Sequence, residues 1–295
     1  MLDLLRSEPP FFAVCMFVLG LAVGSFLNVV IHRLPRMLER AWFTDIASLF
    51  GERGWQSPAA LSAAMGAGSG YNLVAPRSAC PACGHRIRPI ENIPVLSYLW
   101  LRGRCSACRA PISVRYPVVE MAAAVLSAAV AVRFGFSLAA AAAVVLLWAL
   151  LALSLIDFDT QLLPDSITLP LVWAGLAFNL FGALTDLRSA VLGAMAGYLV
   201  LWSVYWLFKL ATGREGMGFG DFKLLSALGA FLGWQLLPVI VLLSSLVGAV
   251  VGGALILLAR RGREVPMPFG PYLACAGAVA LFAGQEITRA YLELL

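Results

Sequence analysis

Two aspartates stand where long apolar segments meet polar loops, and their chemistry depends on whether the fold brings them together. Asp157 ends one apolar segment, and Asp221 precedes another after residues 216–220, where Gly218 and Gly220 allow close approach of a second backbone. Two carboxyl groups at low dielectric cannot both ionise easily, so one serves as an acid while the other takes a proton from water. Such a pair can hydrolyse a peptide bond without a metal. The alternative is that both aspartates cap helices, a common use of Asp.

Four of the six cysteines form two Cys-x-x-Cys pairs, Cys80 with Cys83 and Cys105 with Cys108. Two pairs at this spacing can bring four thiolates to one tetrahedral ion, which is typical of zinc ribbons. Because all four ligands are cysteines, no position is left for a catalytic water, and the predicted zinc ion is structural. Two disulfides are the alternative in an oxidising compartment, but a reducing cytoplasm disfavours them.

Four further polar residues lie in or beside the apolar segments and are weaker candidates for the site. Glu120 and Asn28 lie inside expected spans, where such groups serve either a function or the packing of helices. Asp165 follows a proline at the expected start of a helix, where capping is the alternative role. Lys223 lies two residues after Asp221, a spacing that does not pair two side chains on one helix face.

The composition indicates the environment in which these residues act. Hydrophobic residues make up 61% of the 295 residues and charged residues only 13%, with a mean hydropathy of +0.88, whereas a soluble domain has about 25% charged residues. The net charge of +5 does not predict a nucleic-acid partner, because the basic residues cluster in particular loops as membrane topology requires. The first apolar segment lacks the preceding basic region of a secretory signal peptide, so we expect it to be retained.

Eight apolar segments are candidates for membrane-spanning helices, since about 20 residues cross the hydrocarbon layer. They cover residues 11–32, 117–134, 137–156, 166–184, 188–210, 222–234, 236–259 and 268–290. The predicted fold is an all-α polytopic membrane protein of about eight transmembrane helices, with a small cytoplasmic zinc-ribbon-like loop domain between the first two. The expected domains are a first transmembrane helix at 1–34, a loop with the four-cysteine site at 35–116, and a seven-helix membrane core at 117–295.

The distribution of Lys and Arg predicts the orientation, because basic residues are retained on the cytoplasmic side. With the N-terminus outside, 17 of the 21 basic residues fall on the side of the 33–116 loop and 4 on the other side. Both termini are then outside, and the cysteine loop, Asp157 and Asp221 share the cytoplasmic face. The reducing cytoplasm at that face favours zinc over disulfides.

Ordered motifs run along nearly the whole chain. They are Gly24-Ser25-Phe26-Leu27-Asn28 and the residues up to Pro35, Asn72-Leu73 with Pro76-Arg77-Ser78, the two cysteine pairs, Arg115-Tyr116-Pro117 and the residues up to Glu120, Ile156-Asp157, Pro164-Asp165, Gly218-Phe219-Gly220-Asp221-Phe222-Lys223, and Pro268-Phe269-Gly270-Pro271. With these motifs in this order, the sequence resembles the type IV prepilin peptidases. These are bifunctional leader peptidases and N-methyltransferases of type IV pilus and type II secretion systems.

The resemblance implies that Asp157 and Asp221 are the catalytic pair, and it gives Glu120 some weight in a methylation or substrate site. It implies cleavage of prepilins or pseudopilins after the glycine that ends a short basic leader, at the cytoplasmic face of the bacterial inner membrane. It also implies methylation of the new N-terminal residue with S-adenosylmethionine. No motif in the sequence indicates where this cofactor binds.

A function of another class is a transporter or assembly factor, in which buried acids move ions and the zinc ribbon docks a partner. Ion-coupling acids lie near the bilayer midplane on broken helices, whereas Asp157 and Asp221 are expected at the ends of spans. This placement favours the peptidase interpretation, with prepilins and the lipid bilayer as partners.

Overall fold

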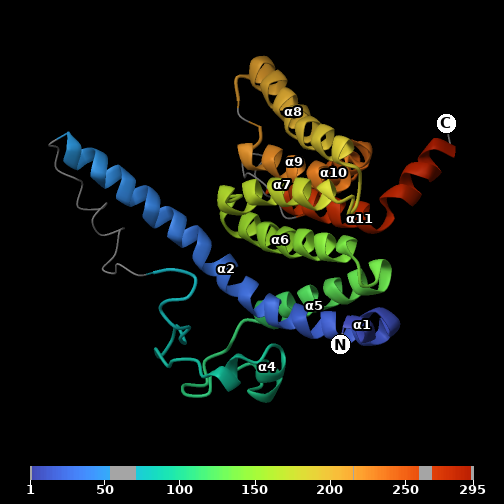
Figure 1. Cartoon of the computed structure of the whole chain (residues 1–295). Helices are drawn as coiled ribbons and strands as arrows, with labels where there is room; N and C mark the ends of the chain where they lie inside the picture. Colours follow the sequence, from blue (N-terminus) through green and yellow to red (C-terminus); the bar gives the residue numbers. More distant parts are fainter. Residues whose placement is uncertain (1, 54–70, 215, 259–267, 294–295) are drawn as a thin grey trace. The chain divides into compact units, whose positions relative to one another are not determined.

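The computed structural model describes residues 2–53, 71–214, 216–258 and 268–293, which are almost entirely helical (Figure 1). Within these ranges the only β pairing is two isolated bridges, Ala79 with Arg86 and Arg104 with Pro111. The elements are α1 (Leu2–Ser7), α2 (Pro9–Glu52), η1 (Pro89–Asn92), α4 (Leu96–Trp100), α5 (Arg115–Phe134), α6 (Leu138–Thr160), α7 (Asp165–Leu180), α8 (Leu187–Thr212), α9 (Phe219–Leu232), η2 (Trp234–Leu236), α10 (Leu237–Leu258) and α11 (Gly270–Glu293). The predicted all-α class is confirmed.

Five helical stretches among the described residues are long and apolar enough to cross a membrane. They are α2, α5, α6, α8 and the stretch Trp234–Leu255. The apolar part of α11 is the shorter Gly270–Gly284, while α7 has 16 residues and α9 has 14. Each of the eight predicted segments therefore coincides with a helix, but α7 and α9 are shorter than the roughly 20 residues of a full crossing.

Helix α2 continues well beyond the predicted span at 11–32. It ends at Glu52 and contains Pro35 in its interior. A proline removes one helical hydrogen bond and disfavours continuation. The residues after Pro35 include Met, Leu, Glu, Arg and Ala, which are strong helix formers, so the helix resumes.

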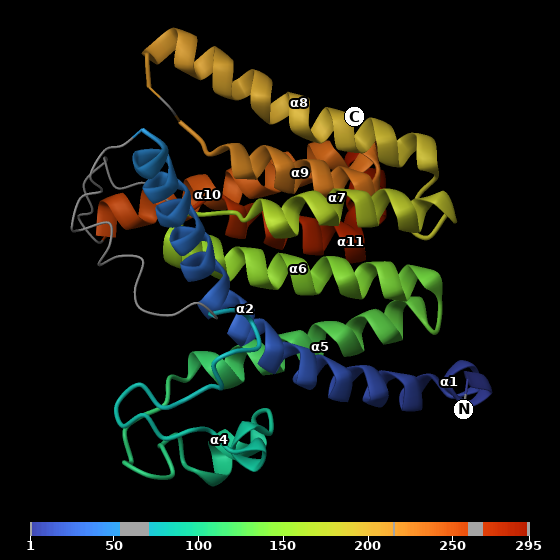
Figure 2. The same ribbon diagram turned by 60° about the vertical axis from the view of Figure 1, so that its left-hand side comes forward.

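The chain divides into two compact units, one comprising Met1–Leu19 with Ala123–Leu295 and the other Gly20–Ala122. The first unit contains helices α6 to α11, with Asp157 and Asp221. Within it, α6, α7, α9 and α11 run alongside one another (Figures 1 and 2). The second unit contains the four-cysteine loop.

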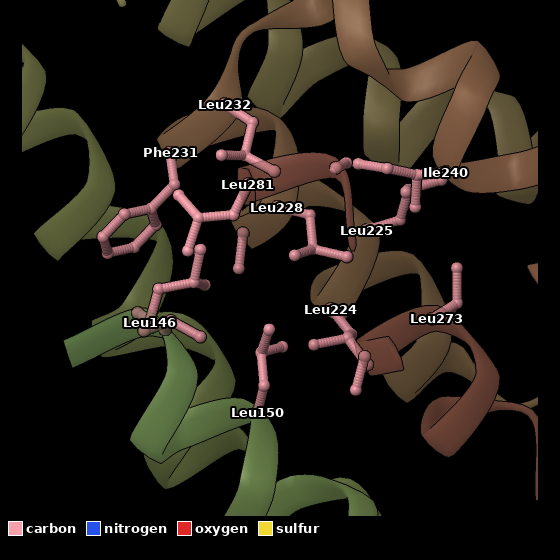
Figure 3. Packing of buried hydrophobic residues seen from close by; sticks show 14 of the residues in the cluster. Leu146, Leu150, Leu224, Leu225, Leu228, Phe231, Leu232, Ile240, Leu273 and Leu281 are labelled. Carbon is pink, nitrogen blue, oxygen red and sulfur yellow. The ribbon is translucent and has the colours of Figure 1, made fainter. Parts of the chain in front are cut away.

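Helix α9 is the most enclosed element of the first unit. From Asp221 to its end at Leu232 every residue except Lys223 is buried, and it packs against α7, α8, α10 and α11. Leu224, Leu225, Leu228 and Phe231 interlock with side chains of α6, α10 and α11 in one core cluster (Figure 3). A helix surrounded by protein does not have to match the thickness of the bilayer, which accounts for its short length.

A seam of glycines brings α8 and α9 into close backbone contact. A Cβ atom at Gly193 or Gly229 would overlap the backbone of the other glycine, and one at Gly197 would lie 2.5 Å from the carbonyl oxygen of Leu225. Small residues four apart allow membrane helices to pack by van der Waals contact between their backbones. The seam therefore fixes the position of α9 and of the aspartate at its start.

Asn179 fixes the other end of α9. Its Nδ2 donates hydrogen bonds to the carbonyl oxygens of Ala230 (2.8 Å) and Phe231 (2.9 Å), and its Oδ1 accepts from the backbone N–H groups of Leu184 and Thr185. The last carbonyls of a helix lack intrahelical partners. One buried side chain thus satisfies two of them and links the end of α7 to α9.

Candidate active site and metal site

Asp157 lies in the last turn of α6, and its side chain is buried, with 5% relative exposure. The helix ends at Thr160, and the next residue, Gln161, adopts a left-handed conformation (φ +54°) and donates its backbone N–H to the Asp157 carbonyl. The Asp157 carboxyl group accepts a hydrogen bond at 2.9 Å from the backbone N–H of Gly270, the first residue of α11. Asp157 therefore joins the end of α6 to the start of α11.

The contact with Asp157 requires glycine at position 270. A Cβ atom there would lie 2.7 Å from Asp157 Oδ2 and 3.3 Å from Leu163 Cδ2. Real Cβ atoms essentially never come this close to a carboxylate oxygen, so any side chain would displace the carboxyl group. In the sequence, Gly270 stands out only as part of the Pro268–Pro271 motif, and nothing in that motif indicates the contact with Asp157.

Asp221 lies in the first turn of α9, directly after the helix start at Phe219. Its side chain is 6% exposed, and its Oδ1 is a buried oxygen without a hydrogen-bond partner in the described part of the chain. Asp157 lies close enough to Asp221 for the charges of the two carboxyl groups to interact. The tertiary fold thus brings together two carboxyl groups that are 64 residues apart in sequence.

Leu163 packs between the helix starts that frame this pair. Its side chain packs against both Gly220 and Gly270. A Cβ atom added at Gly220 would lie 2.6 Å from Leu163 Cβ, and one added at Gly270 would lie 3.3 Å from Leu163 Cδ2. Gly220 is therefore needed for packing. Gly218, in contrast, is exposed with an ordinary φ of −80°, and a Cβ there would meet only Asp221 Oδ2, at 4.0 Å. Its missing side chain leaves open space beside Asp221.

Lys223 and Asp165 form an ion pair beside this site. Lys223 Nζ lies 2.6 Å and 2.7 Å from the two carboxylate oxygens of Asp165, at the first residue of α7. The pair links the starts of α7 and α9, in agreement with the expectation that Lys223 does not pair with Asp221. Sequence spacing could not identify this partner, because the two residues are 58 positions apart.

Glu120 and Asn28 lie in the second unit, and each forms a hydrogen bond with a backbone group of that unit. The buried Glu120 carboxylate accepts a hydrogen bond at 2.7 Å from the backbone N–H of Val95, a residue with φ +60°. A positive φ is unusual for a β-branched residue, so this hydrogen bond supports a strained turn. Asn28 Nδ2 donates to the carbonyl oxygen of Tyr116 at 3.1 Å, which joins α2 to the first turn of α5.

The four paired cysteines converge, with their Sγ atoms all within 4.8 Å of one another. Cys80 Sγ and Cys108 Sγ are 3.8 Å apart. A tetrahedral zinc ion with bonds of about 2.3 Å to sulfur requires Sγ atoms separated by roughly 3.8 Å, whereas a disulfide requires about 2.05 Å. The donor set and its geometry fit a metal ion.

Two matching turns present these sulfurs. After each pair comes a residue in the left-handed conformation, Gly84 at φ +72° and Arg109 at φ +62°, and its backbone N–H bonds to the carbonyl of the first cysteine. The backbone N–H groups of Cys108 and Ala107 point at Cys105 Sγ and lower the pKa of that thiol to about 6. Such hydrogen bonds favour the thiolate, which is the form that binds metals.

Glu91 links the two turns and is a residue that sequence reasoning missed. Its carboxylate accepts a hydrogen bond at 2.9 Å from the Arg88 backbone N–H and lies 3.3 Å from His85 Nε2. These contacts, first that with Arg88 and then one with Ser106 between the second pair of cysteines, lower the pKa of Glu91 to about 2. The carboxylate thus stays ionised and holds both turns together.

Comparison with known proteins adds two family matches and several close relatives. Residues 18–134 match the bacterial peptidase A24 N-terminal domain, and residues 144–253 match the type IV leader peptidase family. The chain is 55% identical over 294 residues to a prepilin leader peptidase/N-methyltransferase of Aeromonas hydrophila, covering 99% of this chain and 98% of the relative. It is also 55% identical to the Pseudomonas aeruginosa protein of the same name, over 99% of this chain and 98% of the relative. No solved structure shows significant similarity.

Proposed function

The chain belongs to the type IV leader peptidase family, and we propose that Asp157 and Asp221 are the catalytic carboxyl groups with which it removes the leaders of type IV prepilins. The observation that carries this assignment is the buried Asp221 oxygen without a hydrogen-bond partner, next to a second buried carboxyl group. A buried polar atom left unpaired costs free energy unless it has a function. A substrate carbonyl or a water molecule supplies the missing partner.

The proposed reaction uses one carboxylate and one carboxylic acid. The carboxylate takes a proton from a water molecule whose oxygen attacks the carbonyl carbon of the scissile bond, while the acid protonates the carbonyl oxygen. The tetrahedral intermediate then breaks its C–N bond, and the leaving amine takes the proton held by the first carboxyl group. Open space at Gly218 gives an extended peptide access to Asp221.

We propose that the second activity is N-methylation of the amine that cleavage releases; the name of the relatives includes an N-methyltransferase. We propose S-adenosylmethionine as the donor, which when bound would supply an electrophilic methyl group to the free amine. Prepilins and the related pseudopilins are the proposed substrates. Glu120 and Asn28 have structural partners in the second unit, which supports a role for them in holding that unit in shape.

The chain is an inner membrane protein, and we propose that its site faces the cytoplasm. The excess of Lys and Arg in the 33–116 loop supports this orientation, with both termini outside. The free, closely spaced cysteine thiols support it as well. We propose that Cys80, Cys83, Cys105 and Cys108 hold one structural zinc ion at that face.

Separate replacement of the two carboxyl groups tests the assignment. We expect Asp157→Asn and Asp221→Asn each to reduce cleavage of a prepilin in membranes by about 100- to 10,000-fold, because each removes one half of the acid–base pair. Asp159→Asn is the matched control, since Asp159 is an exposed carboxyl group two residues from Asp157 and should retain activity. Cleavage at the wild-type rate by either test variant, in folded protein, would refute the assignment and leave ion transport as the alternative.

A further inference from the structure

The two buried carboxyl groups have different surroundings, although both lie at helix ends. Asp157 accepts a direct hydrogen bond from the Gly270 backbone N–H, in the buried interior. Asp221 Oδ1 has no partner in the described part of the chain. The starts of α11 and α9 lie near Asp157 and Asp221 respectively, so helix dipoles favour negative charge at both groups. Each carboxyl group also faces one backbone N–H, that of Gly270 for Asp157 and that of Gly218 for Asp221. The difference between them is the second oxygen of Asp221, Oδ1, which is buried without a partner among the described residues.

A hydrogen bond from a backbone N–H to a carboxylate stabilises the ionised form, and such charge-assisted bonds are roughly twice as strong as neutral ones. An ionised Asp221 would carry charge on a buried oxygen, Oδ1, that no donor compensates among the described residues. Of the two ways to place one proton on the pair, the structure favours the proton on Asp221 and the charge on Asp157.

From this asymmetry, and on the basis of the proposed function, we propose that Gly270 is a positioning residue that assigns the roles of the two aspartates. It holds Asp157 as the carboxylate that removes the proton from water, while Asp221 begins the cycle protonated and donates to the carbonyl oxygen. In the second half, Asp157 gives its proton to the leaving amine. Asp221 recovers a proton from the hydroxyl group of the intermediate as the carbonyl re-forms.

The absence of a side chain at Gly270 is what makes this contact possible. A methyl group there would lie 2.7 Å from Asp157 Oδ2 and 3.2 Å from its Cγ, so the carboxyl group would have to turn away from the N–H. Gly270 is buried, so we expect a Gly270→Ala substitution to act on the reaction through Asp157.

The matched control is Gly277→Ala, two turns later in the same helix. A Cβ at Gly277 would overlap the side chain of Leu228, so this substitution also crowds α11, but against an apolar residue. We expect both variants to lower the melting temperature. Only Gly270→Ala should lower kcat, by about 10- to 100-fold, with KM changed less than about twofold, as for loss of one preorganised hydrogen bond.

The experiment measures kcat and KM for prepilin cleavage by the full chain in lipid nanodiscs, with Asp157→Asn in the same series. If Gly270→Ala and Gly277→Ala lose kcat equally, or if Gly270→Ala keeps the wild-type kcat, the role of Gly270 is refuted while the aspartate assignment stands. If Asp157→Asn retains cleavage, the proposed catalytic pair itself is refuted.

A thermal unfolding cycle keeps the inference testable if Gly270→Ala folds poorly. In an Asp157→Ala background the carboxyl group that meets the new methyl group is gone. We expect Gly270→Ala to lower the melting temperature much less in that background than in the wild type. Gly277→Ala should lower the melting temperature by the same amount in both backgrounds. If Gly270→Ala lowers the melting temperature equally in the two backgrounds, the substitution does not act through Asp157.

Discussion

At the residue scale, the membrane bundle satisfies its buried polar side chains almost completely. Asn179 makes four hydrogen bonds, and Ser226 donates to the carbonyl oxygen of Ala194. Among the described residues, Asp221 Oδ1 is the only buried side-chain nitrogen or oxygen without a partner. An unsatisfied oxygen next to a second carboxyl group is a costly arrangement, which supports the proposed catalytic role of the pair.

The two glycines before Asp221 should respond differently to substitution. We expect Gly220→Ala to cost about 1–3 kcal/mol of stability and to reduce cleavage, because its Cβ would lie 2.6 Å from Leu163 Cβ. Gly218→Ala should leave the melting temperature nearly unchanged, since its Cβ meets only Asp221 Oδ2, at 4.0 Å. Its effect should be a higher KM, because it narrows the open side of the aspartate. Thermal unfolding and initial rates measure both effects, and equal destabilisation by the two substitutions would contradict this account.

At the scale of elements, α9 carries Asp221 but has too few residues to cross a bilayer by itself. Its position depends on its neighbours: the glycine seam with α8, Asn179 at its end and the Lys223–Asp165 pair at its start. The position of Asp221 in the proposed active site therefore depends on these helix contacts.

The seam leads to a prediction about α8, which lies outside the site. We expect Gly193→Ala to separate α8 from α9 and to lower the free energy of unfolding by about 1–3 kcal/mol. Prepilin cleavage should fall as well, because α9 shifts. Met195→Leu on the exposed face of the same helix is the control, with little change expected. Unfolding of the purified protein and prepilin cleavage are the measurements. A Gly193→Ala protein as stable and active as the control would show that the seam does not position Asp221.

At the scale of the whole molecule, the carboxyl pair and the cysteine cluster belong to different compact units. Residues 79–111 have little regular secondary structure of their own, with only two isolated bridges and two short helices. Too few apolar side chains are buried in this loop to hold its shape, since of the core residues only Cys105 lies there. A metal ion is the expected source of its stability.

Metal removal should therefore affect the two units unequally. We expect the purified protein to contain about one zinc per chain, and Cys105→Ser to lose it. Helical content should remain high after chelation, because most helical residues lie outside residues 79–111. Cys275→Ser, outside the cluster, is the control and should keep the metal. Elemental analysis measures the zinc content, and circular dichroism measures the helical content. Undiminished zinc in Cys105→Ser would contradict the proposed ligand set.

The helical class, the four-cysteine cluster and the family could all be predicted from the sequence. Apolar segments of spanning length and Cys-x-x-Cys pairs are local patterns whose meaning does not depend on distant residues. The resemblance built on the ordered motifs is confirmed by relatives that are 55% identical over nearly the whole chain. Asp157 and Asp221 could be proposed as site residues from the sequence for the same reason, since each stands at the end of an apolar segment.

The surroundings of those residues depend on the tertiary fold. The Gly270 donor lies 113 positions from Asp157, and Asp165 lies 58 positions from Lys223. The close backbone contact of Gly193 with Gly229 and the enclosure of α9 likewise arise from helix packing. A local pattern shows which face of a helix is apolar, but the partner it meets depends on how the whole bundle packs. The difference between the two carboxyl groups therefore became visible only in the folded chain.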